Sequence, residues 1–247
     1  PHVCVGLTMA EPHLEVQQLH FRHTIAGRIP LIRKHAILGG GVFDCSFSIE
    51  RGEILGLVGA NGAGKTTTMK ILTGEIMATS GSAYLGGHNI EEDQQRVRRL
   101  IGYCPQFDAL LDRLTVKEHL ELFGRLKGLQ DSELDKAVVS VIEMLSLNKF
   151  TNKLAGTLSG GNKRKLSVGI ALIGGPKILF LDEPSTGVDP VARRFMWGVI
   201  SRICTRQRDC CIILTSHVME EVEALCTRVA VVVGGRMRCL GSNQHLK

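Results

Sequence analysis

Aromatic residues are scarce in this sequence, and it has no long tract of charge of one sign. Only 4% of the 247 residues are Phe, Trp or Tyr. The formal net charge is +6, but acidic and basic residues are interspersed, so no long basic tract stands out. Nucleic-acid-binding domains usually combine a one-sided basic patch with base-stacking rings. We therefore expect no nucleic-acid partner.

Paired cysteines and long apolar runs are also missing. The eight cysteines contain no C-x-x-C spacing, so neither a zinc cluster nor a disulfide framework is predicted, and a reducing cytosolic setting is favoured. Apolar runs such as Val229 to Val233 fall far short of the ~18 residues that a membrane-spanning helix needs. The sequence begins with Pro1 rather than Met, and we expect a piece of a longer protein.

Apolar residues are abundant enough for a core, at 44% of the chain, and their spacing predicts an α/β fold. Thr115 to Ser146 carries leucines and valines three and four residues apart, which indicates helices. Alternating or continuous apolar runs predict strands at residues 14–19, 45–49, 54–58, 178–182, 211–215 and 229–233.

These patterns predict one domain over residues 1–247. We expect a parallel α/β core with an antiparallel β edge, formed by residues 1–100 and 176–247. A mainly helical subdomain would be inserted over residues 101–175. We find no internal repeat or low-complexity tract.

A phosphate-binding loop follows the apolar run that ends at Val58. Gly59, Gly64, Lys65 and Thr66 fit G-x-x-x-x-G-K-[ST], and a helical pattern comes next, which is the strand, loop and helix context that the motif requires. Glycines let backbone N–H groups approach phosphate oxygens, the lysine reaches the β and γ phosphates, and the threonine holds Mg²⁺. A chance glycine turn would not explain this context.

Two carboxylates follow the strand "ILFLD". Asp182 stands at the end of the strand, where it could hold Mg²⁺, and Glu183 could act as general base for an attacking water. The alternative is that Glu183 only hydrogen-bonds the groups that hold the metal. His217 and Gln106 are unremarkable by themselves, since a histidine after a strand is often a cap and most glutamines are solvated.

The order of these features resembles the nucleotide-binding domain of an ATP-binding cassette transporter. "GANGAGKTT" comes first, and then Gln106, "LSGG" at Leu158 to Gly161, "ILFLDEP", "STGVD" and His217. A kinase or GTPase would share the phosphate loop but not "LSGG", and the N-K-x-D guanine reader of GTPases is absent. The segments "GNKRKLS" and "ALIGGPKILFLDEPSTGVDPVARR" resemble the A subfamily, which consists mostly of large membrane proteins with two such domains, many of them moving lipids. The closing residues are most similar to the second domain.

This resemblance implies a P-loop NTPase (RecA-like) core with an inserted signature subdomain, and ATP and Mg²⁺ as cofactors. In the family, two nucleotide domains close head to tail, and each ATP lies between the phosphate loop of one and the "LSGG" of the other. Ser159, Gly160 and Gly161, at a helix N-terminus that favours anions, would touch the γ-phosphate of the partner's ATP. Asp189 would communicate across the dimer.

The resemblance also assigns roles within the chain's own site. Glu183 would be the base and His217 the γ-phosphate sensor, with Lys65 and Gln106 completing the catalytic set. Thr66, Gln106 and Asp182 would surround Mg²⁺. The phosphates would be bound by Gly59, Asn61, Gly62, Gly64, Lys65, Thr66 and Thr67. The family usually stacks an aromatic ring on adenine just after the first strand, and here Phe21 or His23 could serve.

The resulting hypothesis is a Mg²⁺-dependent ATPase domain that powers transmembrane domains from the cytoplasmic face of a membrane. Two alternatives stay open: a soluble cassette ATPase that acts on nucleic acid or ribosomes, and a non-catalytic ATP-gated dimerisation module. The basic residues Lys163 to Lys165 are either a solvated helix face or a feature with a role particular to this family.

Overall fold

The main sheet of the protein has six strands in the order β10-β9-β3-β8-β7-β6. The computed structural model describes residues 14–21, 41–206 and 210–242. All neighbouring strands of this sheet run parallel except β10, which pairs antiparallel with β9. Its strands are β3 (Ile54–Val58), β6 (Ile101–Cys104), β7 (Ile178–Asp182), β8 (Cys211–Ser216), β9 (Arg228–Val233) and β10 (Arg236–Ser242).

A second sheet is antiparallel and has the order β2-β1-β4-β5. Its strands are β1 (Leu14–Phe21), β2 (Val42–Ile49), β4 (Ser80–Leu85) and β5 (His88–Asn89). The antiparallel edge predicted from the alternation of residues 14–19 and 45–49 is therefore present, with two further strands that the sequence did not indicate. The α/β fold class is confirmed.

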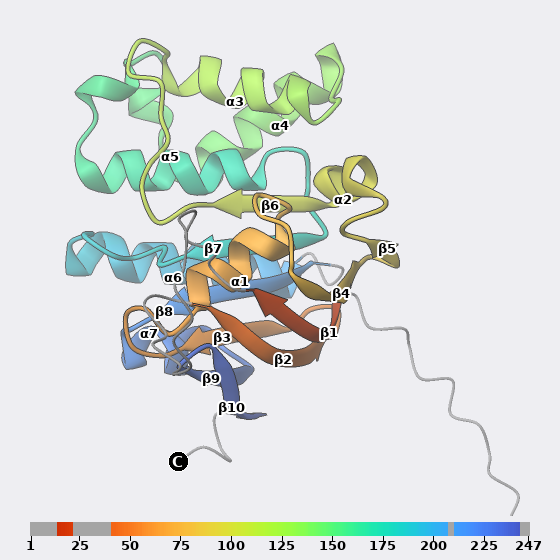
Figure 1. Cartoon of the computed structure of the whole chain (residues 1–247). Helices are drawn as coiled ribbons and strands as arrows, with labels where there is room; N and C mark the ends of the chain where they lie inside the picture. The colour runs from red at the N-terminus through yellow and green to blue at the C-terminus, as the bar shows by residue number, and fades with distance from the viewer. Residues whose placement is uncertain (1–13, 22–40, 207–209, 243–247) are drawn as a thin grey trace, which may run out of the picture.

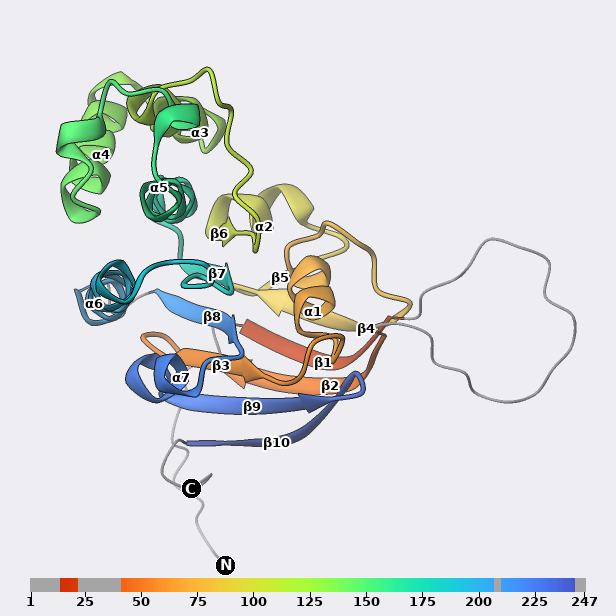
Figure 2. The same ribbon diagram turned by 90° about the vertical axis from the view of Figure 1, so that its left-hand side faces the viewer.

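Seven α-helices occur among the described residues (Figures 1 and 2). α2 lies beside β5 and β6, and the other six fall into three groups. α3, α4 and α5 gather at one end of the molecule beside β6. α6 and α7 cover one face of the main sheet, and α1 lies toward the antiparallel sheet. The helices are α1 (Lys65–Leu72), α2 (Gln94–Leu100), α3 (Val116–Leu126), α4 (Asp131–Met144), α5 (Gly160–Leu172), α6 (Pro190–Arg206) and α7 (Met219–Leu225).

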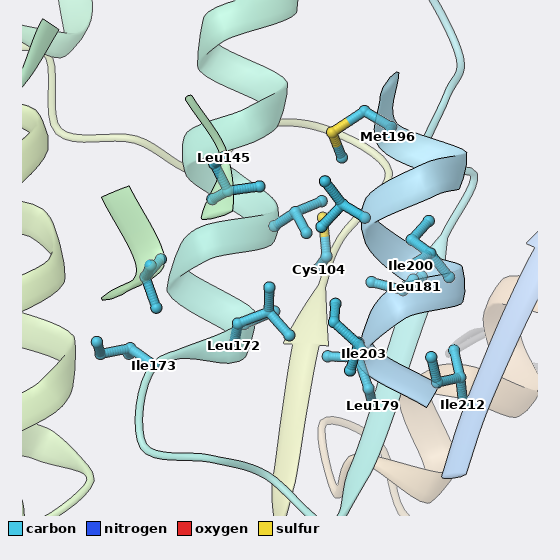
Figure 3. Packing of buried hydrophobic residues seen from close by; sticks show 14 of the residues in the cluster. Cys104, Leu145, Leu172, Ile173, Leu179, Leu181, Met196, Ile200, Ile203 and Ile212 are labelled. Carbon is cyan, nitrogen blue, oxygen red and sulfur yellow. The ribbon is translucent and has the colours of Figure 1, made fainter. Parts of the chain in front are cut away.

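Alternate residues of the central strands supply two apolar cores, one on each face of the main sheet. In β7, Leu179 and Leu181 join the core shared with α3 to α7, whereas Ile178 and Phe180 face the core shared with α1 and the antiparallel sheet. Both faces are covered, which explains why these strands read as continuous apolar runs. Figure 3 shows the first core, where Leu172 from α5 and Ile200 from α6 meet the strands.

The main sheet includes residues just after position 101, the expected start of the helical subdomain, and the division into subdomains stays a prediction. Ile101–Cys104 forms β6 and pairs in parallel with β7, so the sheet core extends to Cys104 before the helical insertion begins. This strand has four residues and no turn signal separates it from α2, because Ile101 follows the helix directly. A side chain on Gly102 would collide with the carbonyl oxygen of Ala171 in α5. The strand therefore depends on close packing against α5, which the sequence around Gly102 does not reveal.

Candidate active site

The phosphate loop, residues 59–67, joins β3 to α1. Gly62 and Gly64 have positive φ angles of 79° and 103°, which residues with a Cβ rarely adopt. α1 begins at Lys65, and no side chain caps its first turn. The free N–H groups of this turn and the helix dipole make the loop suited to an anion.

Lys65 lies over this loop and is only 5% exposed. Its Nζ donates hydrogen bonds to the carbonyl oxygens of Gly59 at 2.7 Å and Ala60 at 3.1 Å. The buried ammonium is therefore paired with the loop itself. These bonds hold the cation on the loop, beside the first turn of α1.

Asp182 ends β7 with one carboxylate oxygen bonded and the other free. Its Oδ1 accepts hydrogen bonds from Thr66 Oγ1 at 3.3 Å and from Thr215 Oγ1 at 2.5 Å. Oδ2 is buried without a hydrogen-bond partner, in a residue that is 1% exposed. A buried carboxylate oxygen without a partner is costly unless a cation compensates it. Together with the Thr66 hydroxyl it provides the oxygen ligands that Mg²⁺ prefers, so these residues fit the metal.

Glu183 follows Asp182 in a left-handed conformation with φ of 49°. Non-glycine residues held in this region cost about 1–3 kcal/mol and tend to occur at functional sites. Its N–H donates to Thr215 Oγ1 at 3.0 Å. Its carboxylate Oε2 accepts from Gln106 Nε2 at 3.2 Å, and His217 Nδ1 lies 3.4 Å away.

The side chains predicted for catalysis thus meet around one cavity. The cavity holds about 590 Å³ and is lined by residues 59–67, Gln106, Glu183, Thr186 and His217. Thr186 was not predicted from the sequence, and its hydroxyl donates to Glu183 Oε2 at 3.0 Å. It stands three residues after Glu183 in the turn, a spacing that could have indicated it.

A buried carboxylate holds the segment that carries His217. Glu221 in α7 accepts hydrogen bonds from Ser216 Oγ at 2.6 Å and from Trp197 Nε1 at 3.0 Å. Ser216 Oγ in turn accepts from the N–H of Val218 at 3.0 Å. The backbone on both sides of His217 is therefore fixed by α6 and α7, while the imidazole itself stays half-exposed.

Leu158 to Gly161, the signature segment, and Asp189 lie outside the residues that line this cavity. Ser159 caps α5, because its Oγ accepts from the N–H of Asn162 at 3.4 Å, and Ser159 and Gly160 are exposed. Asp189 Oδ1 accepts from the N–H groups of Val191 and Ala192 and so caps α6. The two features adjoin, since a Cβ on Gly161 would lie 3.8 Å from Asp189 Oδ2. The structure does not bring them to the chain's own phosphate loop.

The basic run at 163–165 is not one solvated helix face. Arg164 is 3% exposed and donates hydrogen bonds to the loops that carry Glu183 and Gln106. Lys165 Nζ lies 4.2 Å from the centroid of the Phe195 ring, and partial burial lowers its pKa. Arg164 recurs with the buried residues Val168 and Ala171 at helical spacing, and this pattern could have indicated its burial.

Two titratable groups in β6 stay protonated beside the site. Burial raises the pKa of the Cys104 thiol to about 12. Burial, and next the charge of Asp182, raise the pKa of the Tyr103 phenol well above its usual value. Neither group therefore supplies a nucleophile or a base at neutral pH.

Some expectations concern residues that the structure describes only partly. His23 lies outside the described residues, and Phe21 ends β1 with a side chain that is not described. The choice between them for adenine stacking stays a prediction. Over residues 14–21, 41–206 and 210–242, no cluster of three or more His, Cys, Asp or Glu side chains could hold a metal. Within the same ranges no helix has the length and apolar character needed to cross a membrane.

Residues 42–186 match the family model of ABC transporters. The chain belongs to the ABC transporter family. The prediction of an ATP-binding cassette domain is confirmed, and the matched span runs from β2 through the phosphate loop to Thr186 of the active site.

Several curated relatives of this ABC domain are members of the A subfamily, as predicted. The human phospholipid-transporting ATPase ABCA3 is 56% identical over 82% of the chain, and human ATP-binding cassette sub-family A member 2 is 53% identical over 81%. Mouse sub-family A member 7 is 51% identical over 81%. The chain spans only 12%, 8% and 9% of the length of these relatives.

Solved structures share the fold of the ABC domain. An ATP-binding subunit of an ABC transporter has a TM-score of 0.81 and 26% identity, covering 94% of this chain and 91% of that one. The dimeric ATP-binding cassette MJ0796, in a post-hydrolysis state bound to ADP and Pi, has a TM-score of 0.80 and 19% identity, covering 93% and 98%. The ABC ATPase fold is therefore established for this chain.

Proposed function

We propose that this ABC domain binds ATP with Mg²⁺, hydrolyses it, and thereby powers the transport of phospholipid through transmembrane domains of a longer chain. The observation that carries the proposal is the convergence of Lys65, Gln106, Glu183 and His217 on the cavity bounded by the phosphate loop. The lipid cargo is supported by the similarity to ABCA3, a phospholipid-transporting ATPase.

In this proposal the phosphate loop binds the triphosphate through its backbone N–H groups. Lys65 moves its ammonium from the carbonyls of Gly59 and Ala60 onto the β and γ phosphates. Thr66 and Asp182 would hold Mg²⁺, and the bound ion would neutralise the charge that develops on the phosphate oxygens. Asn61 and Thr67 line the same cavity and would complete the phosphate contacts.

Glu183 accepts the proton of the attacking water. Its left-handed backbone and its bonds to Gln106 and Thr186 fix the direction of the carboxylate. A general base must be held within hydrogen-bond reach of the proton that it removes. Gln106 and His217 approach the same oxygen from two other loops, so both would sense whether a γ-phosphate is present.

The partner proposed for this domain is a second nucleotide domain that closes on it head to tail, in the same longer chain. The exposed start of α5, with Ser159 and Gly160 at the surface, supports this arrangement because a helix N-terminus favours the phosphate of a partner's ATP. Asp189 beside Gly161 would face the same junction. We keep the prediction that this chain is the second of the two domains.

The transmembrane domains would dock on a groove between α2, β6 and α3. This groove holds about 560 Å³ and includes Phe123 and Leu126 from α3, Lys127 just after it, and Arg98 and Arg99 from α2. Leu126 is 72% exposed there, and an apolar floor with a basic rim suits an amphipathic helix that carries acidic residues. Docking there would place the domain at the cytoplasmic face of a membrane.

Release of phosphate from ATP by the 247-residue chain tests the proposed activity. We expect steady turnover with MgATP and a fall to the rate of buffer alone when EDTA removes the metal, because Asp182 and Thr66 then lack the cation that they hold. Adding Mg²⁺ back in excess should restore the rate. Unchanged phosphate release in EDTA would show that the reaction needs no metal. Absence of phosphate release both with and without EDTA would instead favour the non-catalytic ATP-gated dimerisation module.

Light scattering after size exclusion tests the head-to-tail partner. We expect Glu183→Gln to shift from monomer to dimer when MgATP is added, because blocked hydrolysis should trap the closed pair. Ser159→Arg in the same background is the matched control, since it would block the signature half-site of the partner's ATP and leave the chain's own phosphate loop intact. A dimer that survives Ser159→Arg would contradict the arrangement.

A further inference from the structure

Arg164 is a buried cation that reaches the loop carrying Glu183. Its Nη2 donates to the carbonyl oxygens of Asp182 at 2.8 Å and Glu183 at 3.0 Å, and its Nε donates to that of Pro184 at 3.0 Å. Three consecutive carbonyls therefore converge on one guanidinium. An extended strand points successive carbonyls to opposite sides, so this convergence requires the turned backbone at Glu183, where φ is 49°.

The same guanidinium reaches the loop that carries Gln106. Its Nη1 lies within hydrogen-bond distance of the carbonyl oxygens of Pro105 at 2.6 Å and Gln106 at 3.3 Å, and of Asp108 Oδ1 at 3.1 Å. Asp108 supplies the one carboxylate in the set. All three guanidinium nitrogens are thus engaged, which a fork of five N–H donors allows and an ammonium does not.

The helix that presents Arg164 is itself fixed. α5 packs on β6 and β7 through Leu172 and its neighbours in the core shown in Figure 3, and Gly102 of β6 touches the Ala171 carbonyl. The guanidinium is held by a buried element rather than by a mobile surface chain. Its position relative to the two strands is therefore set by close packing.

We propose that Arg164 is a positioning residue for hydrolysis, which holds the Glu183 carboxylate and the Gln106 amide in register by clamping the backbones of their two loops. The inference rests on the proposed function and adds a part to it that the sequence did not assign. The strained turn at Glu183 persists because three hydrogen bonds to a charged donor offset its cost. Arg164 touches the main chain of both loops but neither reacting carboxylate oxygen.

A kinetic comparison tests this role. We expect Arg164→Gln to lower kcat on the order of 10²-fold, the loss typical of a misplaced catalytic group, while KM for ATP changes less. Arg164→Lys keeps the charge and should recover only part of the rate, because three donors cannot span both loops. Arg125→Gln, an exposed arginine of α3, is the matched control and should behave as the unchanged chain.

Hydrogen exchange separates this clamp from a general loss of stability. In Arg164→Lys and Arg164→Gln we expect faster exchange at residues 104–108 and 182–186 and unchanged exchange in α1 and β3. Unchanged exchange in the two segments, or a kcat equal to that of the unchanged chain, would overturn the proposal. Faster exchange throughout, with kcat, ATP affinity and melting temperature falling together, would also overturn it, because the role would then be purely structural.

The same pair of measurements distinguishes the two proposals from each other. If the unsubstituted chain releases no phosphate from ATP, the proposed function is refuted, whatever the Arg164 variants show. The exchange experiment needs no hydrolysis, and it then decides by itself whether Arg164 holds the two loops together. Loss of kcat without faster exchange would show that the arginine acts by some route other than the clamp.

Discussion

Glu183→Gln should lower the kcat for ATP hydrolysis by about 10²–10⁴-fold, which is the usual contribution of a general base. The amide keeps the size of the carboxylate, and it can still accept from Gln106 and Thr186, so the loop should hold its shape. It cannot accept a proton from water at neutral pH. ATP affinity should change little, because the phosphate loop and Lys65 are untouched. Phosphate release and equilibrium binding of ATP are the two measurements.

A matched substitution distinguishes the loss of the general base from the loss of a negative charge elsewhere in the chain. Glu133→Gln removes an exposed carboxylate in the first turn of α4 and should leave kcat unchanged. A Glu183→Gln chain that hydrolyses ATP as fast as the unchanged chain would refute the assignment of the base. The carboxylate would then only support its neighbours in the loop.

Phe180→Ala should lower the free energy of unfolding by about 3–5 kcal/mol, the usual cost of removing a buried phenyl ring. Phe180 is the largest fully buried side chain among the described residues, and it lies in the middle of β7 with its ring in the core toward the antiparallel sheet. The free energy of unfolding of a domain is typically only about 5–15 kcal/mol, so this loss is a large share of its stability. Chemical denaturation followed by fluorescence or circular dichroism measures it.

The control for this prediction lies on the surface of the same chain. Phe107 is 81% exposed, and Phe107→Ala should change the free energy of unfolding by no more than about 0.5 kcal/mol. Similar shifts of the denaturation midpoint for the two variants would show that the ring of Phe180 is not packed as described. A changed slope for Phe180→Ala would instead indicate a less compact denatured or native state.

The sequence predicted those parts of the fold and site that depend on neighbours along the chain. The phosphate loop is formed by residues that are neighbours in the sequence: a strand, a glycine turn and a helix follow one another from Ile54 to Leu72. The strand ending at Asp182 was equally plain, because burial on both faces makes it a continuous apolar run. The helices of the inserted subdomain, α3 and α4, were predicted from their apolar spacing.

What the sequence did not predict depends on contacts between distant segments. β6 has four residues and β5 two, too few for a period to show, and each is stabilised by a neighbouring strand rather than by its own composition. In the sequence, Arg164 is one of three consecutive basic residues. Its burial results from the packing of α5 against β6 and β7. Thr215 read as an ordinary strand residue, although its hydroxyl donates to Asp182 and accepts from Glu183.

The order of strands in the main sheet has a consequence for how the domain is made. β3 lies between β8 and β9, yet it leaves the ribosome long before either of them. At roughly 5–20 residues per second, on the order of ten seconds separates the synthesis of Thr67 from that of His217. Asp182 is added only late in that interval, β8 at its end, and β9 after it. The most recognisable motif of the domain is therefore among the first parts made, and the nucleotide site that contains it is among the last to be completed.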